Sequence, residues 1–112
     1  MESANAIKAL GALAQEHRLA AFRLLVQAGE GGLAAGVLAD ALGVPNSSLS
    51  FHLSQLGHAG LVVQQRQGRS LIYTADYAAM NGLVAYLMEN CCAGAACAPV
   101  GQCATIVERK VA

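Results

Sequence analysis

The four cysteines of this chain lie close together near its C-terminal end, at Cys91, Cys92, Cys97 and Cys103. Cysteines spread through a domain usually pack as small apolar side chains, whereas thiolates gathered in one short segment can share a soft metal ion. The rest of the 112-residue chain contains no cysteine. This clustering predicts a sensing site at the edge of a domain whose main task lies elsewhere.

The cellular compartment decides which chemistry these cysteines perform. The first residues, MESANAIKAL, lack the basic and then apolar regions of a secretory signal. No apolar run reaches the roughly 18 residues that a membrane span needs. We therefore expect a cytoplasmic protein without membrane contacts, in which thiols stay reduced. Four reduced cysteines favour metal ligation over two disulfides.

Composition and charge indicate one small helical domain. The hydrophobic fraction is 55%, much of it alanine, and the absence of tryptophan favours closely packed helices. The net charge is zero, yet no acidic residue occurs between Asp40 and Asp76, a window that holds Arg66 and Arg69. A locally acid-free, mildly basic surface is compatible with contacts to phosphate groups.

Periodic apolar residues predict helices at 4–14, 16–28, 33–43, from Pro45 or Asn46 to Gly60, and 76–90. Before the last helix, two β-rich runs flank Gln67-Gly68, and glycine supplies the positive φ that a tight hairpin turn needs. We expect a mainly α protein with a small β-hairpin. It comprises one domain over residues 1–90 and a flexible, cysteine-bearing tail over residues 91–112.

This order of elements is that of a winged helix-turn-helix, whose recognition helix enters the major groove of DNA. The helix that begins near Pro45 carries short polar side chains that can approach phosphates and base edges, and two arginines flank the hairpin turn. The predicted DNA-contacting residues are Asn46, Ser47, Ser48, Ser50, Phe51, Ser54, Arg66 and Arg69. Phe51 either touches a thymine methyl group or turns inward, and His52 lies on the inner side as a packing residue.

The combined pattern resembles the arsenic-repressor (ArsR-type) family of metalloregulators over about residues 5–90. The motifs that carry the resemblance are His17-Arg18-Leu19, Leu38-Ala39, Leu42-Gly43-Val44, Ser47-Ser48-Leu49-Ser50-Phe51-His52-Leu53, Leu56, Ala59-Gly60-Leu61-Val62, Arg66, Gly68-Arg69 and Tyr73. The resemblance implies a homodimeric repressor that pairs through its first and last helices, here 4–14 and 76–90. It also implies that the apo form occupies double-stranded operator DNA and that an inducer releases it.

Two metal sites found among these regulators are absent from the sequence. Many relatives carry a cysteine pair in the helix before the recognition helix, but the predicted helix over 33–43 contains none. Others bind zinc through aspartate and histidine on the last helix, but no histidine follows His58. An arsenite-responsive subgroup instead has two adjacent cysteines at the end of that helix and a third a few residues on. Cys91-Cys92 and Cys97 resemble that pattern, and Cys103 is additional.

The inducer that this resemblance implies is trivalent arsenic or antimony, which bonds up to three thiolates. Adjacent residues on a helix point about 100° apart, so the last helix must fray at Asn90 or Cys91 before both thiols reach one ion. Four thiolates would instead suit zinc or cadmium, and a disulfide would suit redox sensing. The alternatives are therefore a repressor of the same fold that responds to zinc, cadmium or oxidation, or a thiol metal scavenger. We expect neither an enzyme nor an organic cofactor, because the cysteines lack an adjacent base.

Overall fold

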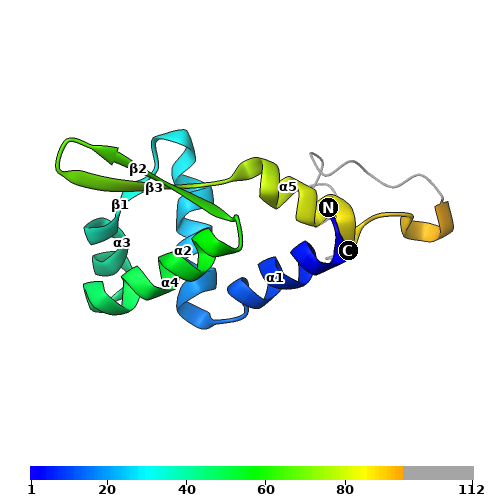
Figure 1. Cartoon of the computed structure of the whole chain (residues 1–112), viewed down its shortest axis with the longest axis horizontal. Helices are drawn as coiled ribbons and strands as arrows, with labels where there is room; N and C mark the ends of the chain where they lie inside the picture. The colour runs from blue at the N-terminus through cyan, green and yellow to red at the C-terminus, as the bar shows by residue number, and fades with distance from the viewer. Residues whose placement is uncertain (95–112) are drawn as a thin grey trace, which may run out of the picture.

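The computed structural model describes residues 1–94, which form five α-helices and a three-stranded antiparallel sheet. The first half contains α1 (Ser3–Leu13), α2 (Glu16–Ala28), a 3-10 turn (Gly29–Gly31), β1 (Leu33–Ala34) and α3 (Ala35–Leu42). The second half contains α4 (Asn46–His58), β2 (Val62–Gln67), β3 (Ser70–Ala75), α5 (Tyr77–Leu87) and a 3-10 turn (Cys91–Gly94). Figure 1 shows the β2–β3 hairpin at one end of the molecule and the outer ends of α1 and α5 at the other.

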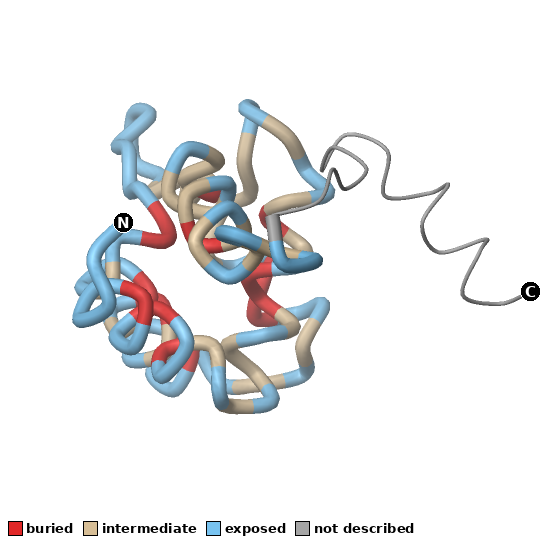
Figure 2. Tube along the Cα trace, turned by 90° about the vertical axis from the view of Figure 1, so that its right-hand side faces the viewer, coloured by how far each residue is buried: buried red, intermediate tan, exposed pale blue. Residues whose placement is uncertain are grey.

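This arrangement confirms the predicted winged helix-turn-helix, with α3 and α4 as the helix-turn-helix and the β2–β3 hairpin as the wing. Figure 2 shows that the buried segments lie on the inner sides of the helices. The largest fully buried side chains are Leu25, Leu38, Leu49, Leu53, Leu56 and Leu61. Half of them come from α4, so the core fixes the orientation of that helix.

Strand β1 corrects the prediction of a helix that starts at residue 33. Leu33 pairs with Tyr73 and Ala34 with Ile72, so β1 forms the edge of a sheet in the order β1-β3-β2. The preceding Gly32 has φ +68°, and a Cβ there would collide with the Tyr73 carbonyl oxygen. Contact with a strand that is distant in sequence therefore overrides the local helical pattern, and α3 starts only at Ala35.

The hairpin turn lies one residue later than predicted. Gln67 pairs with Ser70, so the turn consists of Gly68 and Arg69 rather than Gln67 and Gly68. Gly68 has φ +63°, as the prediction of a glycine-dependent turn requires. Arg66 consequently lies on β2 opposite Leu71, while Arg69 lies in the turn itself.

Helix α5 is fixed at its first turn. The carboxylate of Asp76 accepts a hydrogen bond from the Ala79 N–H at 3.0 Å and caps the helix. The Tyr77 hydroxyl lies 3.0 Å from the Val26 carbonyl oxygen and 3.3 Å from that of Leu25. Both carbonyls belong to the last turn of α2, where the helix itself offers them no partner. This contact attaches the start of α5 to the end of α2.

Helix α5 ends at Leu87, three residues before the predicted end at 90. Asn90, Cys92 and Ala93 have positive φ values of 59°, 57° and 55°, which a right-handed helix cannot accommodate. Asparagine tolerates this conformation better than most residues. The helix thus ends before the cysteines, so Cys91 and Cys92 do not share a regular helical turn.

Helix α1 faces inward with small residues. Ala6, Ala9 and Ala12 are buried, whereas Ile7 is 67% and Leu10 is 42% exposed. Ile7 and Leu10 therefore do not contribute to the core of the single chain, whereas Leu13 at the end of α1 packs against it. Within residues 1–94, no helix has the length and apolar character needed to cross a membrane.

Candidate nucleic-acid interface and cysteine segment

The outer face of α4 carries the six residues of this helix that were predicted to meet DNA. All of them are exposed: Asn46, Ser47, Ser48, Ser50, Phe51 and Ser54. The opposite face packs inward through Leu49, Leu53 and Leu56, each at most 1% exposed. The helical period of 3.6 residues therefore separates an apolar face from a polar one. Short hydroxyl and amide groups on the polar face are suited to approach base edges in a major groove.

The wing carries the two predicted arginines near its tip. Arg66 and Arg69 are both exposed, one at the end of β2 and the other in the turn. A guanidinium group presents a planar fork of N–H donors that matches a phosphate. This position suits the wing for contact with a phosphate backbone beside α4.

A polar groove of about 340 Å³ lies between α4 and the wing. Its lining residues are Ser50, Leu53, Ser54, Gly57, His58, Val62, Gln64 and Tyr73. On the wing side, Gln64 Nε2 donates a 3.1 Å hydrogen bond to the Tyr73 hydroxyl of the neighbouring strand. The sequence places His58 in the acid-free window but gives no signal that it faces this groove, because the groove forms only when the wing folds beside α4.

Phe51 stays on the surface and does not turn inward. It is 57% exposed, and the Arg18 guanidinium carbon lies 5.4 Å from the centroid of its ring. This distance is typical of a cation–π contact. His52 is half-buried, and its Nδ1 accepts a 3.2 Å hydrogen bond from Arg18 Nε. His52 thus packs inward as predicted, but it does so through a polar contact with α2.

The surroundings of His52 hold its pKa below the ordinary histidine value of 6.5. Burial is the main cause, since it disfavours the charged form, and the positive charges of Arg18 and His17 act in the same direction. The His17 and His52 ring centroids are 5.8 Å apart. Only an unprotonated Nδ1 can accept the Arg18 N–H, so the neutral form of His52 is the form that holds Arg18.

Comparison with known proteins shows which proteins this chain resembles. The helix-turn-helix domain matches residues 13–65, from the end of α1 into β2. The HTH-type transcriptional regulator NmtR of Mycobacterium tuberculosis is 39% identical over 72 residues, which cover 64% of this chain and 58% of the relative. The match thus spans less than two thirds of that relative's length. An ArsR-like transcriptional regulator from Rhodococcus sp. RHA1 has a TM-score of 0.68 at 26% identity, covering 97% of this chain and 93% of the other.

The chain resembles the ArsR-type winged-helix regulators in sequence and in fold. Two further solved structures resemble it. One is the homodimeric winged helix-turn-helix DNA-binding domain of a possible ArsR-family regulator from Mycobacterium bovis, with a TM-score of 0.61, 29% identity, and coverage of 77% of this chain and 80% of the other. The second is a possible transcriptional regulator for arsenical resistance, with a TM-score of 0.64, 29% identity, and coverage of 71% and 80%.

The cysteine segment of this chain starts at Cys91, shortly after the end of α5 at Leu87. Cys91 donates its backbone N–H to the Met88 carbonyl oxygen at 3.0 Å, and Cys92 is exposed. The structure has Cys91 in a disulfide, so metal ligation by its thiolate requires reduction first. Cys97, Cys103 and the rest of the predicted tail beyond residue 94 lie outside the described residues. In the part that is described, no three His, Cys, Asp or Glu side chains gather into a metal site, so the cysteine site stays a prediction.

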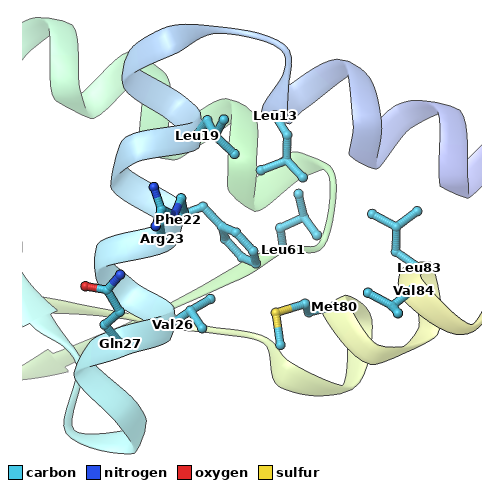
Figure 3. Close-up of a pocket in the computed structure, with 10 residues that line it drawn as sticks. All are labelled: Leu13, Leu19, Phe22, Arg23, Val26, Gln27, Leu61, Met80, Leu83 and Val84. Carbon is cyan, nitrogen blue, oxygen red and sulfur yellow. The ribbon is translucent and has the colours of Figure 1, made fainter. Parts of the chain in front are cut away.

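An apolar cavity of about 310 Å³ lies between α2 and α5. Figure 3 shows Phe22 and Val26 of α2 on one side of it and Met80 and Val84 of α5 on the other. Within residues 1–94, the hydrogen bonds between α5 and α2 are those of Tyr77 in the first turn of α5. The middle of α5 therefore leaves an apolar gap against α2.

Proposed function

We propose that this chain is an arsenite- or antimonite-responsive transcriptional repressor that acts in the reducing cytoplasm. It binds double-stranded operator DNA as a homodimer, and trivalent arsenic held by Cys91, Cys92 and Cys97, with Cys103 as a possible fourth ligand, releases it. The observation that carries this proposal is the exposed polar face of α4 beside a wing with two arginines. The related proteins named above are transcriptional regulators, which supports regulation rather than an enzymatic role.

Exposed apolar side chains on α1 and α5 support pairing of two copies through these helices. Ile7 and Leu10 of α1 and Leu87 of α5 are 67%, 42% and 59% exposed. The two helices contact each other, and the Met1 side chain just before α1 lies 3.6 Å from the Cβ position of Gly82 on α5. A second copy would remove these apolar groups from water. The homodimeric state of the Mycobacterium bovis domain supports the same arrangement.

The proposed signal acts on the free end of α5. In a dimer that pairs through α1 and α5, the two α4 helices enter major grooves about 34 Å apart, one DNA turn. Thiolates that close around one ion after Leu87 would move the last turn of α5, while Tyr77 holds its first turn against α2. The cavity beside Met80 and Val84 leaves room for that movement. Coupling of this kind typically amounts to about 1–3 kcal/mol, a change of roughly 5- to 150-fold in DNA affinity.

The test is fluorescence anisotropy of the reduced protein on the DNA upstream of its own gene, titrated with arsenite. We expect affinity that falls steeply with salt and release near stoichiometric arsenite. The Cys91→Ser and Cys92→Ser variants should bind DNA normally but no longer dissociate from it when arsenite is added. The Cys103→Ser variant removes one thiol in the same way and tests whether Cys103 is an additional ligand. Continued arsenite release from the Cys91→Ser variant would show that the site is assigned wrongly. The absence of salt-dependent DNA binding would favour a thiol metal scavenger.

The disulfide at Cys91 favours a second candidate, a thiol-redox-responsive repressor of the same fold. In that case two thiols form one disulfide and their two electrons and two protons pass to the oxidant. Release by diamide, which accepts them, together with indifference to arsenite, would select this candidate. Release by zinc or cadmium alone would select the metal-responsive alternative with four thiolates.

A further inference from the structure

The recognition helix α4 has two flanks, and the wing covers only one of them. Ser50, Ser54 and Gly57 border the groove shared with the wing. On the other flank, His52 faces the first turn of α2, where it meets Arg18. A helix that lies in a major groove has a phosphate strand on each side, because the groove is only about 12 Å wide. If the wing arginines contact one DNA strand, the phosphates of the other strand lie beside the α2 flank.

Arg18 is held at this flank by two contacts with α4. Its Nε donates to His52 Nδ1 at 3.2 Å, and its guanidinium carbon lies 5.4 Å from the Phe51 ring centroid. The guanidinium group has five N–H donors, and the bond through Nε uses one of them. The two terminal nitrogens stay available as donors, and together they can bind a phosphate in a bidentate manner. The exposed ring of Phe51 supports the guanidinium through this cation–π contact.

The position of Arg18 on α2 is unfavourable for the helix itself. Arg18 lies in the first turn, where the partial positive charge of the helix N-terminus repels a cation. The acidic residue of that turn, Glu16, is two residues away and therefore points about 200° around the helix from Arg18. The helix terminus, Arg18 and the neighbouring His17 together make this flank attractive to an anion.

We propose that Arg18 binds a DNA phosphate on the strand opposite the one that the wing contacts, with His52 and Phe51 as its positioning residues. This inference rests on the proposed DNA binding and adds a contact that the sequence did not indicate. It also gives Phe51 the role of a platform for a phosphate-binding arginine, in place of a contact to a thymine methyl group.

The experiment measures DNA affinity over a series of salt concentrations for Arg18→Ala and for the matched variant Arg23→Ala. Arg23 is an exposed arginine on the same helix, about 140° around it from Arg18, at the rim of the apolar cavity. Each variant is tested on the DNA upstream of the gene and on an unrelated duplex of equal length. Thermal unfolding of each variant is recorded in parallel.

If the inference is right, Arg18→Ala lowers the slope of log affinity against log salt by about two per dimer, one phosphate for each subunit. It weakens binding to both duplexes by the same factor, while Arg23→Ala keeps the wild-type slope. An unchanged slope for Arg18→Ala, with or without weaker binding, would overturn the inference and leave Arg18 as a structural residue. If Arg18→Ala does not fold, Arg18→Met keeps the packing stem without the charge, and the same slope criterion applies. A wild-type protein without salt-dependent binding would instead refute the proposed function itself.

Discussion

The hydroxyl of Tyr77 lies 3.0 Å from the carbonyl oxygen of Val26, and this contact joins the first turn of α5 to the last turn of α2. It provides a partner for a carbonyl group that the end of α2 leaves unpaired. The other end of α5 leads directly into the cysteine segment. One end of the helix is thus fixed to α2, and the other leads to the proposed ligand site.

Replacement of Tyr77 by phenylalanine removes this contact and little else. We expect a loss of about 1 kcal/mol in the free energy of unfolding, because one hydrogen bond is lost and a carbonyl at the end of α2 is left without its partner. Denaturant titration measures it. The matched variant Tyr86→Phe removes a hydroxyl that makes no hydrogen bond within residues 1–94 and should cost less. Equal stability of the two variants would contradict the role given to Tyr77.

The Gly32→Ala substitution tests the pairing of strand β1 with strand β3. The added Cβ would lie 2.6 Å from Thr74 Cγ2 and would collide with the Tyr73 carbonyl oxygen, at a residue with φ +68°. With ψ −169°, this backbone conformation is essentially restricted to glycine and costs another residue about 1–3 kcal/mol, and the collision adds to that cost. Gly36→Ala is the control, since no atom lies within 4 Å of its Cβ position in α3 and alanine favours a helix by up to about 1 kcal/mol. The two substitutions should shift the melting temperature in opposite directions.

Stability should depend on pH through His52. Its pKa in the folded protein lies below 6.5, so between these two values the unfolded chain binds a proton that the folded protein does not. The contribution of His52 is fully present above about pH 6.5 and is lost as the pH falls through the folded pKa, where a charged ring would also face Arg18 and His17. Unfolding free energies from pH 8 to pH 5 should therefore fall less steeply in His52→Gln than in the wild type. If His52→Gln follows the wild-type curve, the Arg18–His52 contact does not control this titration.

The exposed residue Ile7 offers a test of dimer formation. Ile7→Glu should shift the protein toward the monomer in sedimentation velocity without loss of helix content, because the residue is 67% exposed in the single chain. A buried charge in the paired state would cost far more than a charge in water. Val37→Glu introduces the same charge at a residue that is 52% exposed on α3, away from α1 and α5, and should stay dimeric. If both variants are monomeric, or if both stay dimeric, the result would argue against pairing through α1.

The winged-helix resemblance and the exposed polar face of α4 were predictable because their signals are local. In α4, apolar residues at Leu49, Leu53 and Leu56 recur at helical spacing, and a helix with that pattern must turn its serines outward. The glycine in the hairpin turn is equally local. The resemblance to ArsR-type regulators depended on these short motifs, and the comparisons confirm it. The cysteine ligands were predicted by the same route and await the arsenite titration.

Three features depended on contacts between distant parts of the chain. Strand β1 exists because Leu33 meets Tyr73, and the contact of Arg18 with His52 joins residues 34 positions apart. The polar groove that includes His58 requires the wing to fold beside α4. The sequence alone determined the helices, their buried faces and the polar surface of α4, since periodicity acts within a few residues. Only the tertiary structure decided which side chains meet across those helices, because such contacts depend on how whole segments pack and leave no local pattern in the sequence.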